Sequence, residues 1–341
     1  QPAVRSTREI LRFDRWQRKI FRLLKSSDGL IRIRHLDYST PAKGGERWPI
    51  YLLEVGKPAA LKKHAVTLVS GVHGLETIGI RIHLDLLKCL INPKSKFFSR
   101  DLADGKFGIY SIPILNPAGV ARLTRANARG IDLNRNSGIR AEKALPFFGG
   151  HKISAMLPYY SGKTRQRESR AIFRFLAEHV WRRKKKIHTA LDIHSGYGSE
   201  NFLWWPYSFS ARTVFQEKAF TGIAAELRKN HPTYRMEPMS ASYQMHGDLW
   251  DHALLEFEKR QRGLHKKRSL FLPYTFELGT WHEIKKSPRR LFNREKIFNP
   301  PAESRKVYLK EHRRLLWDFI HLHSRRDKRS AFLKALTKEI R

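Results

Sequence analysis

One of the sixteen histidines has a glutamate three residues later, in the segment His73-Gly74-Leu75-Glu76. This segment follows a run of apolar and β-branched residues, 65–71, that predicts a buried strand ending at a glycine. In open α/β sheets ligands bind beyond the carboxyl ends of strands, so both side chains stand where a site would form. The alternative is a helix start near Glu76 with an ordinary polar histidine beside it.

A second histidine, His194, ends another apolar run, Leu191-Asp192-Ile193-His194, and is followed by Ser195-Gly196. On its own it could be a hydrogen-bonded histidine at the end of a strand. Together with His73 and Glu76 it supplies two imidazoles and one carboxylate from two strand ends. Two nitrogens and one oxygen, with a fourth position open for water, form the ligand set of a catalytic zinc site.

Two further segments carry polar side chains in unusual settings. Residues 125–136 (RANARGIDLNRN) crowd arginines and asparagines into a turn. An arginine fork binds carboxylates, so this turn indicates an anion clamp, unless it is a solvated loop of a basic protein. Glu277 lies within an apolar strand, 271–278. A buried carboxylate needs a partner, although strand alternation also allows Glu277 to face solvent.

The elements that must position these residues alternate along the chain. Strands are predicted at 49–56, 65–71, 107–115, 188–193, 201–205 and 271–278, and helices at 8–25, 76–90, 166–184, 211–229 and 302–321. Strands that alternate with helices indicate an α/β sheet with helices on its faces.

Taken in order, the motifs resemble those of the carboxypeptidase A family of zinc metallocarboxypeptidases, and their spacing is closest to bacterial members. The pattern is His-x-x-Glu, Arg, Gly-x-Asp-x-Asn-Arg-Asn, His-Ser, Tyr and Thr-Phe-Glu-Leu, running from Trp48 to Leu278. The resemblance implies a central mixed β-sheet of about eight strands with helices on both faces. Residues 1–323 would form the catalytic domain, and 324–341 a basic C-terminal tail.

The resemblance also implies how the metal and the reacting water are handled. His73, Glu76 and His194 would bind one Zn²⁺ per chain. Asp132 would hold the first zinc histidine in one tautomer. Glu277 would act as general base and then as general acid. The enzyme would be a metallocarboxypeptidase, a protease that hydrolyses the C-terminal amide bond of a peptide.

The remaining residues implied by the resemblance bind substrate. Arg125 would polarise the scissile carbonyl, and Asn134 with Arg135 would grip the terminal carboxylate. Tyr243 would close over the substrate. By their spacing, Trp250 would form the floor of the specificity pocket and Ser208 a second position in it. These residues, in the order just given, are Arg125, Asn134, Arg135, Tyr243, Trp250 and Ser208.

The sequence departs from the family pattern in three places. The usual Asn-Pro-Asp-Gly reads Asn116-Pro117-Ala118-Gly119, which puts the geometry of that loop in doubt. Ser137 stands where an aromatic residue is common. Extra length before Glu277 is basic and includes residues 259–268, and we expect it near the cleft, where it would favour acidic substrates, unless it is a solvated loop.

The composition of the chain restricts its possible functions less than the motifs do. The 341 residues carry a formal net charge of +36, which suits an anionic polymer, nucleic acid or membrane surface as readily as it suits adaptation to a compartment. The single cysteine, Cys89, excludes an internal disulfide and is expected to be a buried core thiol. No apolar run reaches the roughly 18 residues of a membrane span. Gln1 in place of Met fits removal of a signal peptide or a truncated chain, so we expect a periplasmic or secreted protein, and a cytoplasmic one stays open.

Three alternative functions remain from the sequence. A small-acid deacylase similar to aspartoacylase would use a similar His-x-x-Glu, but the intact Tyr243 and Thr-Phe-Glu-Leu segments are closer to the peptidase. A peptidoglycan-peptide carboxypeptidase or amidase would suit the bacterial spacing and a basic surface. An inactive basic protein that binds nucleic acid or an anionic polymer would show no hydrolysis and a steep salt dependence of binding. Retention of all three metal ligands and Glu277 favours the enzyme.

Overall fold

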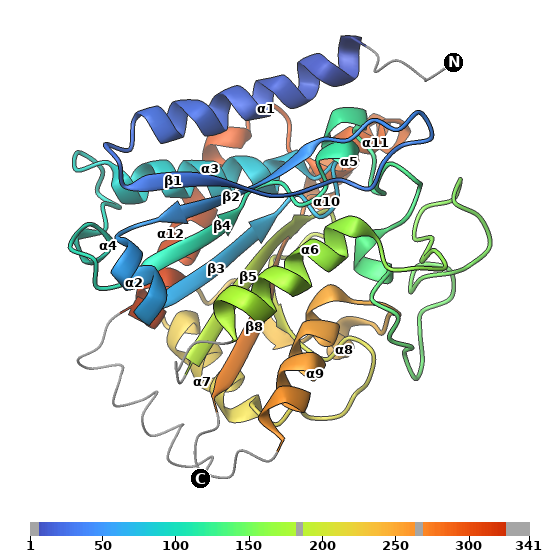
Figure 1. Ribbon diagram of the computed structural model, residues 1–341. Helices are drawn as coiled ribbons and strands as arrows, with labels where there is room; N and C mark the ends of the chain where they lie inside the picture. Colours follow the sequence, from blue (N-terminus) through green and yellow to red (C-terminus); the bar gives the residue numbers. More distant parts are fainter. Residues whose placement is uncertain (1–6, 182–186, 263–268, 325–341) are drawn as a thin grey trace.

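The computed structural model describes residues 7–181, 187–262 and 269–324. Its centre is a mixed sheet of eight strands in the order β1-β2-β4-β3-β5-β8-β6-β7 (Figure 1). The strands are β1 (Ile31–Tyr38), β2 (Pro49–Val55), β3 (Ala65–Ser70), β4 (Gly108–Ile112), β5 (Ile187–Ser195), β6 (Phe202–Trp205), β7 (Arg235–Pro238) and β8 (Leu270–Leu278). The predicted α/β sheet with about eight strands is confirmed.

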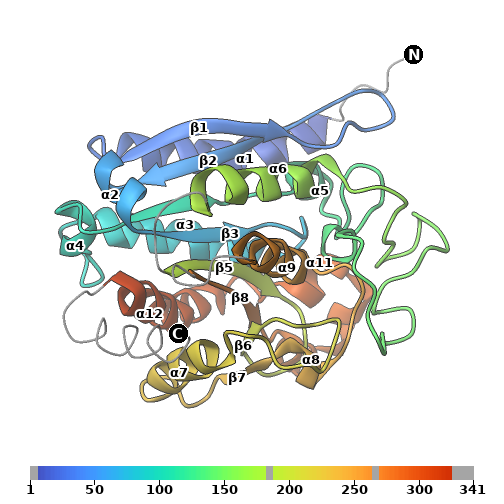
Figure 2. The ribbon, with the colours of Figure 1, turned by 60° about the horizontal axis from the view of Figure 1, so that its bottom comes forward.

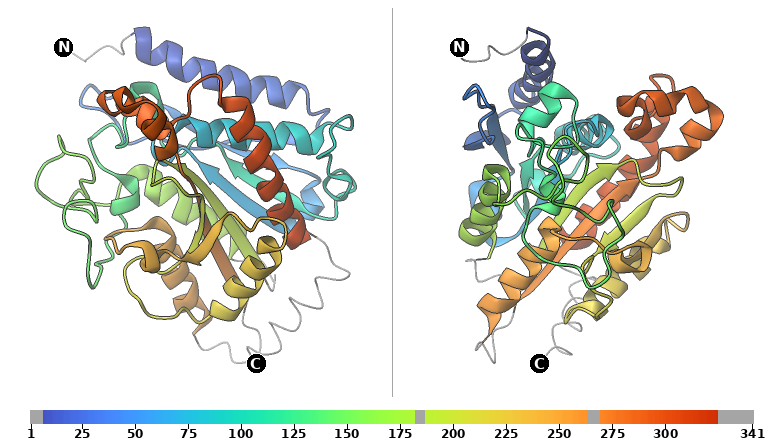
Figure 3. Two further views of the ribbon diagram at one scale, coloured as in Figure 1. Left: turned by 180° about the vertical axis from the view of Figure 1, so that it is seen from behind. Right: turned by 90° about the vertical axis from the view of Figure 1, so that its right-hand side faces the viewer.

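Helices cover both faces of this sheet, as the resemblance implied. One face carries α1 (Thr7–Lys25), α3 (Thr77–Ile91), α7 (Glu217–Arg228) and α12 (Arg305–Ser324), seen in front of the strands in the left view of Figure 3. The other face carries α6 (Arg167–Phe175), continued by one π-helical segment η2 (Leu176–Val180), and α9 (Leu249–Gln261), both in front of the sheet in Figure 2.

Short helices lie in the connections. They are α2 (Pro58–Lys63), α4 (Arg100–Ala103), α5 (Pro117–Arg122), α8 (Met239–Ser242), α10 (Trp281–Lys286) and α11 (Arg294–Phe298), with 3-10 turns η1 (Leu133–Arg135) and η3 (Pro288–Phe292). No helix in the three described ranges combines the length and apolarity that a bilayer crossing requires.

Burial explains why the central strands could be predicted from the apolar pattern of the sequence. Every residue of β3, β5 and β8 is buried except the half-buried Ile187, because helices cover both faces. The edge strands β1 and β7 were not predicted. β1 exposes His35 and Arg34 on an edge, and β7 has only four residues, so neither shows an apolar pattern.

The three strands that matter for function run parallel. β3 pairs with β5, and β5 pairs with β8, so that all three end at the same edge of the sheet. The register places His194 directly beside Glu277. Because neighbouring strands lie about 4.8 Å apart, this strand pairing alone brings together two residues that are far apart in the sequence.

Two other expectations concern residues away from this edge. Cys89 is half-buried rather than buried, and burial raises the pKa of its thiol. The predicted tail, 324–341, lies outside the described residues apart from Ser324, the last residue of α12.

Candidate metal centre and catalytic cleft

His73, Glu76 and His194 meet at the carboxyl edge of the sheet. His73 lies in the turn after β3, Glu76 directly precedes α3, and His194 lies in β5. The carboxylate of Glu76 contacts both rings, with Oε1 2.7 Å from His73 Nδ1 and Oε2 3.1 Å from His194 Nδ1. The two Nδ1 atoms are 3.3 Å apart. All three side chains are buried and together could hold a metal ion.

The turn that carries His73 and Glu76 depends on a close backbone contact. A Cβ added to Gly74 would lie 1.9 Å from the carbonyl carbon of Gly119, so no other residue fits there. Asn116 braces this contact, because its Oδ1 accepts a hydrogen bond from Gly119 N and its Nδ2 donates to Val72 O. The loop is therefore closed by Asn116 although the family's aspartate is replaced by Ala118.

Two buried aspartates set the tautomers of the histidines. His73 Nε2 lies 3.0 Å from Asp132 Oδ1, and His194 Nε2 lies 2.9 Å from Asp192 Oδ2. A carboxylate accepts hydrogen bonds, so Nε2 of each histidine carries the hydrogen and donates it. Nδ1 of each histidine then presents its lone pair towards the other histidine.

This donor set fits a zinc ion. Two imidazole lone pairs and a carboxylate that face one another repel unless a cation lies between them. Zinc binds nitrogen and oxygen at about 2.0–2.2 Å in a tetrahedron, which puts neighbouring donors roughly 3.3 Å apart, as the two Nδ1 atoms are. Carboxylate partners behind the histidines are also typical of zinc sites.

Asp192 has a second partner, Trp250. The indole Nε1 donates to Asp192 Oδ2 over 2.9 Å, the same oxygen that holds His194. Asp192 was not among the site residues predicted from the sequence. The signal available was an acidic residue in an apolar strand two positions before a histidine, which places both side chains on one face.

Glu277 lies beside the candidate metal ligands. Its Oε1 accepts a hydrogen bond from Tyr197 N at 3.0 Å. Burial, and then repulsion from Glu76, raises the pKa of Glu277 to about 8. A carboxyl group with such a pKa can both take and return a proton near neutral pH.

Arg125 is held in place by the carboxylate that also holds His73. Arg125 Nε donates to Asp132 Oδ2 over 2.7 Å, and Nη1 lies 3.4 Å from Glu76 Oε1. Burial acts to lower the pKa of Arg125, but the charge of Asp132 outweighs it and the pKa is raised. The same pairing overcomes burial and keeps the pKa of Asp132 low. Both groups are therefore charged at neutral pH.

Asn134 and Arg135 lie next to each other in η1. Asn134 Oδ1 accepts from Leu249 N at 3.3 Å, which leaves its amide nitrogen as a donor. The Arg135 guanidinium donates from Nε and Nη2 to Phe148 O and from Nη1 to Asn134 O. These three bonds fix the plane of the guanidinium and leave a further N–H on each Nη atom.

Aromatic side chains line the space between these groups. The guanidinium carbons of Arg125 and Arg135 lie 4.8 and 5.5 Å from the centre of the Tyr159 ring, a contact that sequence reasoning missed. Tyr243 stacks on Tyr197 with ring centres 5.3 Å apart. Burial raises the pKa of Tyr243 to about 12 against the opposing charge of Arg135, so its phenol keeps its proton.

These residues border one cavity of about 410 Å³. The sequence-predicted residues that line it are His73, Glu76, Arg125, Asn134, Arg135, His194, Tyr243 and Glu277. Asp132 lies behind them and is fully buried.

The structure places the two residues predicted for a specificity pocket, Trp250 and Ser208, outside the lining of this cavity. Trp250 does not line the cavity, because α9 begins at Leu249 and turns the indole into the core against Asp192. Ser208 is fully buried, and its hydroxyl donates to Asp251 Oδ2 at 2.6 Å. Trp204, Met239 and Thr275 line the cavity in their place.

The described part of the basic insertion lies elsewhere than expected. Lys259 and Arg260 end α9, whose first turn is at the site and whose last turn is beside the start of β8. Arg260 packs over the ring of Trp181. The described part of the insertion is therefore at the opposite end of the sheet from the cleft, and 263–268 lie outside the described residues.

Comparison with known proteins extends these observations. The family model for zinc carboxypeptidase matches residues 42–313. No match is found among curated protein sequences.

Among solved structures, thrombin activatable fibrinolysis inhibitor is similar with a TM-score of 0.63 and 20% identity, over 92% of this chain and 74% of that chain. Carboxypeptidase A from Helicoverpa armigera has a TM-score of 0.58 and 20% identity, over 76% and 62% of the two chains. A metallo-carboxypeptidase from Pseudomonas aeruginosa has a TM-score of 0.53 and 18% identity, over 96% and 69%. These structures share the fold, and the match to the family model covers most of the sequence. The chain therefore belongs to the zinc carboxypeptidase family.

Proposed function

We propose that the protein is a zinc-dependent metallocarboxypeptidase that removes C-terminal residues from peptides. The observation that carries the proposal is that three candidate metal ligands, a carboxyl group with a raised pKa and two arginines border one cavity. One zinc ion per chain would be held by His73, Glu76 and His194.

The proposed chemistry is hydrolysis of an amide bond by water. A zinc ion in this site supplies Lewis acidity, which activates water and polarises a carbonyl group. Glu277 takes a proton from the attacking water as the new C–O bond forms. It then passes that proton to the amine nitrogen as the C–N bond breaks, which balances the reaction.

Arg125 supports this step because it remains charged and is fixed by Asp132. A fixed positive charge beside the carbonyl stabilises the negative oxygen that develops in the transition state. Since Arg125 is already oriented, no reorganisation is needed when that charge appears.

Selection of the C-terminal residue would depend on Asn134 and Arg135. A free carboxylate is a planar acceptor that matches a guanidinium fork. Arg135 is held by three hydrogen bonds to backbone carbonyls and still has N–H groups for this contact. An internal peptide bond offers no such charge, so the clamp favours exopeptidase activity.

The other walls of the cavity support a preference for apolar side chains. They include Leu145, Phe148, Trp204, Met239 and Phe298. Within the described lining, the only acidic residues are Glu76 and Glu277, both assigned above to the metal and the proton transfer. A C-terminal lysine or arginine would therefore lack a dedicated partner.

The test measures metal content and C-terminal residue release on the same purified sample, with a library of free-acid peptides and the same peptides amidated. We expect about one zinc per chain and release of apolar residues from the free acids. Glu277→Gln should keep its metal and lower kcat by about 10³-fold, within the range for general acid–base groups.

Glu217→Gln is the matched control, because Glu217 is a half-buried carboxylate that accepts from Trp205 Nε1 away from the cavity. It should retain full turnover. A folded, zinc-supplied protein that binds no metal and releases no residue would show the proposal to be wrong.

A further inference from the structure

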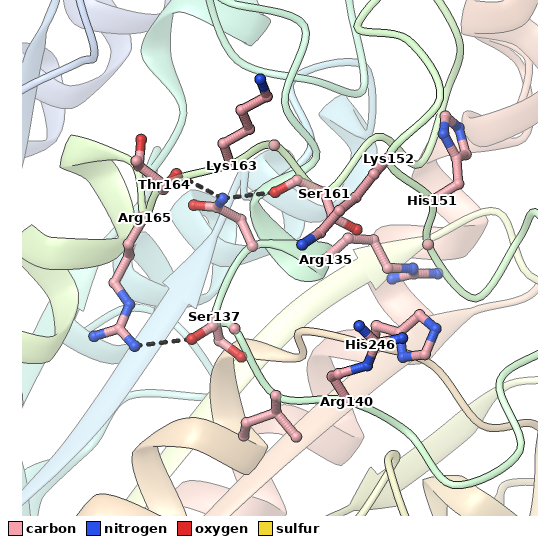
Figure 4. A pocket seen from close by; sticks show the side chains of 15 residues that line it. Arg135, Ser137, Arg140, His151, Lys152, Ser161, Lys163, Thr164, Arg165 and His246 are labelled. Atoms are coloured by element: carbon pink, nitrogen blue, oxygen red, sulfur yellow. Dashed lines mark hydrogen bonds between the residues drawn. The ribbon is translucent and has the colours of Figure 1, made fainter.

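A second cavity adjoins the catalytic one, and Arg135 lines both. It has a volume of about 560 Å³ and lies among the loops between residues 135 and 165 and His246. Its arginine and lysine side chains are Arg135, Arg140, Lys152, Lys163 and Arg165. In Figure 4 the labelled basic residues surround Ser137 and Ser161. We call this cavity the basic pocket.

The charge in the basic pocket is of one sign. None of its lining residues is acidic. Burial lowers the pKa of Arg165. The charge of Glu256, which lies outside the lining, opposes this shift only in part. Within the part of the chain that the structure describes, Arg140, Lys152 and Lys163 form no ion pair. Elsewhere arginines are paired, as in Arg34 with Glu54 and Arg313 with Asp85.

Two hydrogen-bond donors in the lining are buried without a partner among the described residues. They are the hydroxyl of Ser137, which is 3% exposed, and Nε of Arg165. The Arg165 guanidinium is also tethered, because Nη2 donates to Ser137 O over 2.8 Å. Burial of a donor without an acceptor is unfavourable, so a ligand that reached either group and accepted from it would relieve that cost.

His246 lies among the positive charges of the basic pocket, and its pKa responds to them. Burial and the charges of Arg140, Arg135 and Lys152 lower its pKa, so the ring is neutral at physiological pH. Its Nδ1 accepts a hydrogen bond from Ala141 N at 2.9 Å, which leaves the proton on Nε2. The ring therefore adds a neutral donor to the lining.

We propose that the basic pocket binds a small multivalent oxoanion, one that carries phosphate or sulfate groups. Guanidinium, ammonium and hydroxyl donors are the groups that recognise such oxygens. The cavity is too large for a single such group and offers cationic side chains on several loops. Nothing in this inference depends on the hydrolytic activity, since the pocket can be tested by binding alone.

The test is calorimetric titration of the zinc-loaded protein with inorganic pyrophosphate at about 0.1 M salt, where screening acts over about 10 Å. The variant is Arg140→Glu with Lys152→Glu. Both side chains are exposed, so the fold should be retained, which thermal unfolding checks. We expect the association constant to fall by at least about tenfold, because two charges in contact range of the anion are reversed.

The matched control is Lys62→Glu with Lys63→Glu, which makes the same change in net charge. Both lysines are exposed at the end of α2, at the far end of the sheet from the loops of the basic pocket (Figure 1). We expect less than a threefold change, since screening removes most of the field over that distance. Any binding of pyrophosphate to zinc is common to all the proteins and cancels in this comparison.

Ser137→Ala tests the site without a change of charge. It should weaken pyrophosphate binding by about fivefold, the value of roughly one hydrogen bond. Equal weakening in the two charge-reversed proteins would mean that the general field of the chain attracts the anion, and would overturn the proposal. So would no binding of pyrophosphate, including a case in which an amidated acidic peptide binds in its place.

Discussion

The catalytic cavity and the basic pocket share Arg135 but arrange charge in opposite ways. In the catalytic cavity the cationic and anionic groups are paired, as in Arg125 with Asp132 and with Glu76. In the basic pocket no carboxylate lines the wall. Paired buried charges are fixed in position and their field stays local, whereas unpaired charges project a field into the solvent. The first arrangement suits chemistry on a bound group, and the second suits attraction of an anion.

Arg135 lines both cavities, so its substitution tests the difference between them most directly. Arg135→Gln should lower kcat/KM on free-acid peptides by about 100-fold, since removal of one partner of a buried charge pair costs about 2–5 kcal/mol. The effect should appear mainly in KM if Arg135 binds the carboxylate in ground and transition states alike.

Arg140→Gln is the matched change within the basic pocket. It should leave kcat/KM within about twofold, because Arg140 does not line the catalytic cavity. Steady-state kinetics on the same peptide measures both variants. Equal losses would show that the two cavities act as one substrate site and that the distinction between them fails.

Asp132→Asn tests whether pairing maintains the catalytic cavity. The substitution removes the charge that holds both His73 and Arg125, so zinc affinity should fall by about 10- to 100-fold. Competition with a chelating dye measures this affinity. Asp37→Asn is the control, since Asp37 is a buried aspartate paired with Arg167 and Arg174 far from the zinc ligands. An equal loss in both would indicate general destabilisation.

The pH dependence of hydrolysis tests the state of Glu277. A general base works when deprotonated, so kcat/KM should fall up to tenfold per pH unit as the pH drops below the pKa of Glu277. Without metal that pKa is about 8 because burial and Glu76 raise it. A bound zinc ion favours the carboxylate and should move the acid limb below 8. A flat profile from pH 5 to 8 would remove Glu277 from the role of base.

Trp250→Phe should have a small effect on the zinc site. It removes the indole N–H that holds Asp192, and through Asp192 the orientation of His194. We expect zinc affinity to fall by less than about tenfold, because the direct contact between Asp192 and His194 remains. Trp205→Phe, which loses an indole bond to Glu217 instead, should not change zinc affinity. A change in peptide preference with unchanged metal affinity would restore Trp250 to a substrate pocket.

The sequence by itself determined the central strands of the sheet and the groups that meet at their carboxyl ends. Apolar runs 65–71, 188–193 and 271–278 are strands buried on both faces, and such runs stand out because helices exclude water from both sides. His73, Glu76, His194 and Glu277 stand at or just beyond the ends of these strands. Parallel strands end at one edge, so their meeting followed from local pattern and from the family resemblance.

Only the tertiary structure decided which side chains stand behind and beside that edge. Trp250 and Ser208 had been expected in a substrate pocket, but their side chains donate hydrogen bonds to Asp192 and Asp251 instead. The basic end of α9 was expected near the cleft. It lies at the other end of the sheet, because α9 begins beside the cleft and runs along the sheet away from it. The basic pocket is formed by loops around Ser137 and His246, about one hundred residues apart in the sequence. Loop packing of this kind has no period in the sequence, so no local pattern predicts it.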